Sequence, residues 1–157
     1  MHRNANINDL SFIYEQIMEG SKHGYFNRKF QELPAAANGL KLELTSILKN
    51  KIRPNGLSSY GIIYEFNDKP VGFIIMSAGE ENKGTELWMA AIHSDYQNRG
   101  HGKKMIAGVL EQFKGRNLIL MARCAPESEA MFQLLLKSGF RHLATGEEGY
   151  RGLAYEL

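Results

Sequence analysis

Hydrophobic residues recur at helical spacing in two segments near the N-terminus. The first segment runs from Leu10 to Met18, with Asn8 or Asp9 as the expected helix cap, and the second spans Leu40–Leu48. The residues between them, 21–38, combine aromatic and basic side chains without a clear period. We therefore expect two helices joined by an irregular stretch.

The centre of the chain changes to β-branched and aromatic runs, which favour strands. Ser59–Phe66 and Val71–Ser77 are separated by the turn-forming residues 67–70 and predict a hairpin. A further turn at Glu80–Gly84 precedes a third strand, Thr85–Ile92. Together these runs predict a three-stranded antiparallel meander.

The C-terminal half alternates between the two periods. It is predicted to form a helix, a strand, a second helix and an antiparallel pair of strands, at Lys103–Phe113, Leu118–Ala122, Glu129–Lys137, Phe140–Thr145 and Tyr150–Leu157. The strand Leu118–Ala122 is apolar throughout, as expected for a strand covered on both faces, and Gly139 suits a left-handed helix cap. This order predicts an α+β fold with about four helices and a mixed, mostly antiparallel sheet that has a parallel crossover at its centre.

Composition narrows the class of protein. No repeat or low-complexity linker divides the 157 residues, so we expect one domain over 1–157. The net charge of +2 is too small to favour a nucleic-acid partner, and no apolar run predicts a signal peptide or a membrane span. Cys124 is the only cysteine, which excludes an intrachain disulfide and a cysteine-rich zinc site and fits a cytoplasmic protein.

One polar turn carries candidate chemistry. It follows the strand ending at Ile92, contains Gly100 and Gly102, and leads directly into an amphipathic helix. The N-terminus of a helix presents unpaired N–H groups and about half a positive charge. Glycines let an anion reach that backbone, and Arg99, Lys103 and Lys104 add cations. The turn therefore predicts a phosphate or pyrophosphate site.

Known glycine motifs for nucleotides fit this turn poorly. A Walker loop requires Ser or Thr after the lysine, but Lys104 follows Lys103, and Gln97 stands where its first glycine belongs. A Rossmann turn requires a third glycine where Met105 stands. A helix N-terminus without a ligand is a further alternative.

The pattern Gln97-x-x-Gly100-x-Gly102, between a strand and a helix, resembles the acetyl-CoA signature of the GNAT superfamily of N-acetyltransferases. The downstream helix that runs through Leu134 and Lys137 into Gly139-Phe140 is similar to the second motif of that family. The two motifs occur in the family's order and in its secondary structure, so the resemblance covers most of the chain.

The resemblance implies a cofactor site and no metal. The backbone of the loop would hold the CoA pyrophosphate, and the strand before it would pair with the pantetheine amides. The implied residues are Ala90, Ala91, Ile92, Gln97, Asn98, Arg99, Gly100, His101, Gly102 and Lys103. The family's sheet splays between this strand and Leu118–Ala122 to admit the cofactor, and one strand amide would polarise the acetyl carbonyl.

Direct attack of an amine on a thioester needs a base, because an amine is mostly protonated near neutral pH. Glu86 lies six residues before Ile92, a spacing that resembles the catalytic glutamate of the histone-acetyltransferase branch. Even spacing would also place Glu86 on the strand face of Trp88, Ala90 and Ile92. The alternative is that Glu86 is a solvated residue near the start of its strand.

One position departs from the family. The tyrosine that commonly protonates the leaving thiolate is replaced by Leu135, which leaves Tyr150, Ser128 or solvent as the acid. His93 and His101 beside the loop are expected to be solvated. Cys124 is expected to be a buried apolar residue, since direct transfer needs no nucleophilic thiol.

We therefore expect an N-acetyltransferase that moves an acetyl group from acetyl-CoA to a primary amine in a ternary complex. The alternatives are a CoA-binding domain without turnover and an enzyme for longer acyl chains, which would need a wider slot than a packed core near Met89 and Met121 suggests. Homodimerisation stays open, and no nucleic acid or membrane is expected as a partner.

In the family, the acceptor is selected by the region between the first two helices and by the last loop, here 21–38 and 146–150. Aromatic residues in the first region suit an apolar contact: Tyr25, Phe26 and Phe30. Glu147 and Glu148 in the last loop are candidates for attracting a cationic amine, or form a solvated turn.

Overall fold

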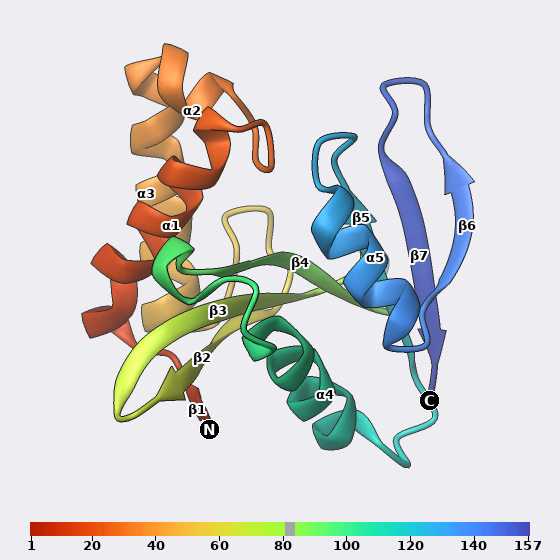
Figure 1. The fold of residues 1–157 in the computed structure, drawn as a ribbon. Coiled ribbons are helices and arrows are strands. Elements are labelled where there is room, and N and C mark those ends of the chain that lie inside the picture. The colour runs from red at the N-terminus through yellow and green to blue at the C-terminus, as the bar shows by residue number, and fades with distance from the viewer. Residues whose placement is uncertain (81–83) are drawn as a thin grey trace.

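In the described part of the chain, seven strands form one sheet, and helices lie on both of its faces (Figure 1). The computed structural model describes residues 1–80 and 84–157. The sheet has the order β1-β2-β3-β4-β5-β7-β6, with strands β1 (His2–Asn4), β2 (Ser59–Phe66), β3 (Lys69–Ala78), β4 (Thr85–Ile92), β5 (Ile119–Cys124), β6 (Arg141–Thr145) and β7 (Arg151–Glu156). The helices are α1 (Leu10–Lys22), α2 (Lys29–Glu32), α3 (Pro34–Asn50), α4 (His101–Phe113) and α5 (Glu129–Lys137).

The architecture confirms the predicted fold class. Strands β4 and β5 run parallel, and the other five pairings in the sheet are antiparallel. The four predicted helices are present, and the single-turn helix α2 is an addition. A parallel pair at the centre requires a long crossover, which α4 provides.

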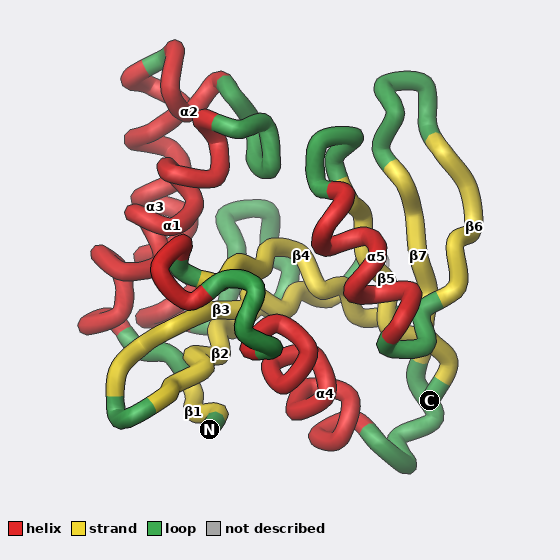
Figure 2. Tube along the Cα trace, viewed as in Figure 1, coloured by secondary structure: helices red, strands yellow, loops and turns green. Residues whose placement is uncertain are grey.

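Two apolar clusters hold helices on opposite faces of the sheet. On one face, α1 and α3 pack against residues of β2 and β3 that include Ile63, Phe73 and Ile75. On the other face, α4 and α5 pack against alternate residues such as Ile74 and Met76, together with β5 and β7. Figure 2 shows the same arrangement, with α1–α3 grouped apart from α4 and α5.

Strand β5 differs from its prediction, because only one of its faces is buried. Leu120, Ala122 and Cys124 are buried, whereas Ile119 and Met121 are 49% and 42% exposed. The helices α1 and α3 cover β2–β4 and do not reach over β5 (Figure 1). The apolar run was therefore misleading, and the packed core expected around Met121 is absent on that face.

The N-terminal region is more ordered than its sequence pattern predicted. Helix α3 begins at Pro34, because proline suits the first helical position, and α1 continues to Lys22, so the expected irregular stretch shrinks to a short connection around α2. Asp9, one of the two predicted caps, is the N-cap residue of α1, although its side chain makes no capping bond to that helix. The short 3-10 turn before α1 is capped by Asn6 in a capping box with Asp9.

Strand β1, which the sequence pattern did not indicate, is held to this turn by an ion pair. Arg3 donates to both carboxylate oxygens of Asp9, at 2.8 and 2.9 Å. Burial by itself raises the pKa of the Asp9 carboxyl, but hydrogen bonds from Arg3 and from the Asn6 N–H, with the charge of Arg3, outweigh it and lower that pKa.

The predicted hairpin forms with a shorter turn than expected. Asn67 and Asp68 both have positive φ angles, as a two-residue type I′ turn requires. Pro70 lies inside β3, where the pairing with β2 shifts between Tyr64 and Glu65. The predicted turn at Glu80–Gly84 falls partly on residues 81–83, outside the described residues.

Strand β4 contains a bulge that changes which side chains share a face. Its register against β3 passes from Met76↔Leu87 to Ile75↔Met89, so Trp88 has no partner. An extra residue reverses the alternation of side chains from that point on. Residues before and after Trp88 therefore cannot be placed by simple even spacing.

We expect Gly72 to be required for the contact between β4 and α4. A Cβ atom at this position would lie 2.9 Å from the Ala91 carbonyl oxygen and 3.0 Å from the Met105 sulfur. Gly72→Ala should lower the free energy of unfolding by about 1–3 kcal/mol in a denaturant titration.

The matched control is Gly39→Ala on helix α3, where an added Cβ meets nothing within 4 Å. It should raise the free energy of unfolding by about 0.5–1 kcal/mol, because alanine favours helix. Equal stability of the two variants would contradict the close packing at Gly72.

Candidate active site

The central feature of the site is an opening between two neighbouring strands. Parallel pairing of β4 with β5 joins Thr85, Glu86 and Leu87 to Leu120, Met121 and Ala122, and it stops there. Beyond Leu87, β4 keeps its pairing with β3, while β5 keeps its pairing with β7. The sheet is therefore splayed at its parallel pair, as expected, and one backbone edge of β4 is left without a strand partner.

The hydrogen-bonding direction along β4 decides which of its residues face this opening. The His93 N–H donates to the Val71 carbonyl at 2.8 Å, so residues of the same parity, including Ala91, point their backbone groups toward β3. The backbone groups of Ala90 and Ile92 then point into the opening. Of the three strand residues expected to pair with a cofactor, these two have the required direction.

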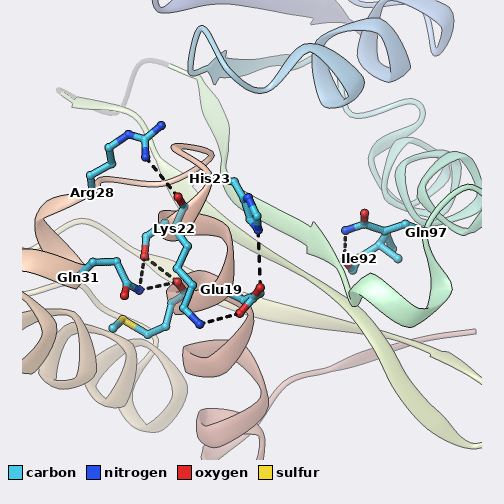
Figure 3. A network of polar contacts seen from close by, with 9 residues as sticks. Glu19, Lys22, His23, Arg28, Gln31, Ile92 and Gln97 are labelled. Carbon is cyan, nitrogen blue, oxygen red and sulfur yellow. Dashed lines mark hydrogen bonds and ion pairs between the residues drawn. The ribbon is translucent and has the colours of Figure 1, made fainter.

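Gln97 connects the end of β4 to the loop that follows. Its side-chain amide donates to the Ile92 carbonyl at 2.9 Å, as Figure 3 shows. This bond occupies the acceptor of Ile92 and leaves its N–H facing the opening. Gln97 thus shapes the loop by holding its start against the strand.

The loop ends in an exposed helix N-terminus. Gly100 is the N-cap of α4, has a φ of 83° and offers no side chain to cap the helix. The N–H groups of His101, Gly102 and Lys103 have no partner within the helix, because they belong to its first turn. An added Cβ at Gly100 meets nothing within 4 Å. The space in front of these N–H groups is open to an anion.

His101 is buried rather than solvated, which contradicts the sequence-based expectation. The residue is 5% exposed, and its Nδ1 lies 3.1 Å from the Tyr64 hydroxyl. The rings of Tyr64, Phe66 and Tyr96 surround it at 4.7–5.9 Å. His101 therefore fixes the first turn of α4 to strand β2 and offers its backbone, rather than its ring, to a ligand.

The packing of α4 against α5 leaves no room for a side chain at Gly102. A Cβ here would lie 2.9 Å from Cδ2 of Leu134 on α5. The close approach of α4 and α5 that this glycine permits borders a groove of about 210 Å³, lined by Lys103, Ala107, Leu110, Leu134, Lys137 and Ser138. Lys103 belongs to both the loop and the groove, so the two features are continuous.

Glu86 lies at the point where the strands part, on the face covered by α1 and α3. It pairs with Ser77 of β3 and precedes the bulge, so it shares a face with Trp88 but not with Ala90 or Ile92. This corrects the even-spacing prediction. The Glu86 side chain is 19% exposed, and its Oε1 accepts from Arg123 Nε at 3.2 Å.

Arg53 supports this side of the bulge. Its guanidinium lies 3.8 Å from the centre of the Trp88 ring, donates to Glu43 Oε1 at 3.0 Å and donates to the Ser77 hydroxyl at 3.2 Å. Helix α3, β3 and β4 are thereby tied together next to Glu86. Neither Arg53 nor Arg123 was singled out from the sequence, because their partners are distant along the chain.

The position of the usual proton donor is filled by an apolar side chain. Leu135 is 2% exposed and belongs to the core beneath α5. Tyr150 is 43% exposed in the turn between β6 and β7, and Ser128 precedes α5. Cys124 is buried, as expected, and burial raises the pKa of its thiol to about 11.

The end of α1 and the connection to α2 form one wall beside the opening. Gln31 donates to the Met18 carbonyl and the Ser21 hydroxyl, and Glu19 pairs with Lys22 and His23 (Figure 3). Arg28 reaches across to Glu127 after β5, at 3.8 Å. This wall carries the predicted aromatic residue Tyr25, which is 47% exposed.

Within the described parts of the chain, no group of His, Cys, Asp and Glu side chains is suited to hold a metal ion. None of the described helices combines the length and apolar character needed to cross a bilayer. The site thus consists of an uncapped helix N-terminus, a strand edge without a strand partner and, across the sheet, a carboxylate.

Comparison with known families and structures gives a consistent result. Residues 21–140 match the model of the acetyltransferase (GNAT) family. No curated protein matches the chain. The match leaves out most of α1 and both C-terminal strands, β6 and β7, which belong to the same sheet.

Solved structures share the fold at low sequence identity. The chain is similar to an N-acetyltransferase from Staphylococcus aureus Mu50, with a TM-score of 0.73 and 17% identity over 99% of this chain and 100% of the other. It also resembles the ribosomal-protein-S18-alanine N-acetyltransferase from Escherichia coli, with a TM-score of 0.68 and 14% identity over 99% of this chain and 92% of the other. A third similar structure is a mutant form of the spermidine/spermine N-acetyltransferase SpeG from Vibrio cholerae, with a TM-score of 0.66 and 17% identity over 99% of this chain and 93% of the other.

The burial of Cys124 predicts a thiol of low reactivity. With its pKa raised to about 11, the native thiol should be alkylated at pH 8 about two orders of magnitude more slowly than the same thiol in the unfolded chain. Mass spectrometry after iodoacetamide treatment, with and without denaturant, measures both rates. Equal rates in the two conditions would contradict the burial.

Proposed function

The chain belongs to the acetyltransferase (GNAT) family, and from this premise we propose that it transfers an acetyl group from acetyl-CoA to a primary amine. The observation that carries the proposal is the opening beside β4, which leads directly to the uncapped N-terminus of α4. An elongated cofactor with a diphosphate at one end and a thioester at the other matches this combination.

The diphosphate would bind at the loop. The N–H groups of His101, Gly102 and Lys103 point at the open space before α4, and the helix dipole favours an anion there. Asn98 and Gly100, both with positive φ, shape the approach. Exposed cations surround it, namely Arg99, Lys103 and Lys104.

The remainder of the cofactor would extend in two directions from the loop. The pantetheine arm runs along β4, where Ala90 and the Ile92 N–H offer backbone hydrogen bonds toward the opening. The nucleotide end lies in the groove between α4 and α5, beside Lys103 and Lys137. Ala91 contributes to the strand but directs its backbone groups toward β3.

The acetyl group would then reach the part of β4 near the bulge, with Glu86 on the opposite face of the sheet. Glu86 takes a proton from the bound ammonium, and the neutral amine attacks the thioester carbonyl. A backbone N–H on the free edge of β4 polarises that carbonyl. The new C–N bond forms, the nitrogen releases its second proton to solvent, the C–S bond breaks, and CoA leaves as a thiolate.

The leaving group needs little assistance, because a thiol with a pKa of about 8.5 is a good leaving group near neutral pH. This accounts for an enzyme that has Leu135 at the usual tyrosine position. Solvent, Tyr150 or Ser128 would return the proton to sulfur.

A second candidate is a domain that binds CoA without turnover. The observation that favours it is Leu135, a buried apolar side chain without a proton to donate, at a position where the family commonly has a proton donor. The two candidates predict the same cofactor binding and differ in whether an amine releases free thiol.

The first test is thiol release from acetyl-CoA over a panel of amines, with Glu86→Gln as the variant. Loss of the base should lower kcat/KM by about 10²- to 10⁴-fold. The control is Glu156→Gln, an exposed carboxylate on β7 that pairs with Arg141, which should behave as wild type.

The outcomes separate the proposals. If CoA raises the melting temperature but no amine releases thiol, the binding domain is the correct description. If Glu86→Gln retains wild-type turnover, the assignment of the base is wrong while the transferase proposal stands.

A second test asks why Gly102 is needed. Gly102→Ala should weaken CoA binding by displacing Leu134, and the double variant Gly102→Ala/Leu134→Ala should restore much of it by removing the clash. Isothermal titration calorimetry with CoA measures both affinities. If the double variant binds as poorly as the single one, the methyl group obstructs the ligand itself.

A further inference from the structure

We infer that the acceptor is an amine bearing a neighbouring carboxylate, as in an α-amino acid, and that Arg123 binds this carboxylate. The inference rests on the proposed function and adds the chemical class of its second substrate. It starts from the uncovered face of β5, which the sequence pattern did not predict.

Arg123 stands directly beside the point where β4 and β5 part. It follows Ala122, the last residue of β5 that pairs with β4, and it lies on the same face as Met121, the partner of Glu86. Because none of the described helices covers this face of β5, an acceptor that reaches Glu86 from solvent passes over Arg123.

Only one nitrogen of the Arg123 guanidinium donates a hydrogen bond to another described residue. Its Nε donates to Glu86 Oε1 at 3.2 Å, and its side chain is 67% exposed, against 19% for Glu86. Among residues 1–80 and 84–157, its two terminal nitrogens have no hydrogen-bond partner. A guanidinium with two free parallel N–H directions suits a carboxylate.

The Glu86–Arg123 pair is complementary to a zwitterion. Glu86 and Arg123 place a negative and a positive group side by side at the border between the covered part of this face and the open part over β5. An α-amino acid carries an ammonium and a carboxylate that can pair with these two groups. Among the residues that the structure describes, Glu86 Oε2 has no hydrogen-bond partner, so it can receive the ammonium while the Arg123 terminal nitrogens receive the carboxylate. A simple cationic amine would instead meet an uncompensated like charge, which disfavours it.

Two other arginines, Arg53 and Arg151, make contacts that distinguish them from Arg123. Arg53 is held by Glu43 and Ser77 beneath the bulge, and Arg151 donates to Glu129 and lies over the Phe132 ring on the α5 side. The acidic residues expected to attract a cationic amine, Glu147 and Glu148, lie in the β6–β7 turn. That turn is beyond Gly152, the residue opposite Arg123, and is therefore farther from the parting point.

The test compares acceptors that differ only in the carboxylate. Suitable pairs are L-phenylalanine with phenethylamine, L-leucine with isopentylamine and L-lysine with cadaverine. Wild type should show at least about tenfold higher kcat/KM for the carboxylated member of a pair. In Arg123→Gln, the KM of that member should rise about 10- to 100-fold, with little change for its partner.

Two further variants distinguish recognition from structure. Arg123→Lys keeps the charge but loses the planar fork, so it should restore only part of the discrimination. Arg141→Gln removes a comparably exposed arginine, paired with Glu156 at 3.4 Å, and should leave the discrimination intact. All variants should melt close to wild type, because exposed ion pairs contribute little to stability.

The result that overturns the inference is turnover without discrimination. If wild type acetylates amines but does not prefer the carboxylated member, or if Arg123→Gln keeps the preference, Arg123 belongs to a solvated ion pair only. The proposed function would survive that result.

If no acceptor releases thiol, the proposed function fails, and binding decides the inference. Saturation-transfer NMR of the amino acids with the CoA-loaded protein then shows whether they bind through Arg123. Binding that Arg123→Gln abolishes supports the carboxylate site, and the absence of binding overturns it.

Discussion

The arrangement of this protein depends on a parallel strand pair that stops after three residues. Up to Leu87, β4 is an ordinary interior strand, and beyond it the strand has a partner on one side only. The backbone groups of Ala90 and the N–H of Ile92 would be costly to bury without partners. The opening therefore favours a ligand that supplies amide hydrogen bonds along its length, which is the reason to place the pantetheine there.

The proposed anion site depends on how firmly the first turn of α4 is held. Gln97 ties the loop to the end of β4, and the buried His101 ties the helix to Tyr64 of β2. Such anchors keep the helix N–H groups oriented before a ligand arrives, so less conformational freedom is lost on binding. Gly102 adds the close contact with α5 that completes the groove.

The proposed cofactor site and the proposed acceptor site lie on opposite faces of the sheet. The α4 and α5 side would hold the cofactor, and the opposite side presents Glu86 and Arg123 beside the uncovered β5. The bulge at Trp88 makes this division possible, because it lets the strand direct Leu87 and Ala90 to one face while Glu86 points to the other. An amine and a thioester can thus approach the same point of the sheet from opposite sides.

Apart from β1 and α2, the sequence by itself determined the order of the elements, and it also determined the glycine loop and the family, because hydrophobic period and turn residues are local properties of the chain. Only the tertiary structure decided the burial of His101, the open face of β5 and the face that carries Glu86. Each of these depends on residues distant in sequence: the aromatic rings around His101, the reach of α1 and α3, and a bulge set by pairing with β3. The Arg123–Glu86 pair joins residues 37 positions apart, so no local pattern could reveal it.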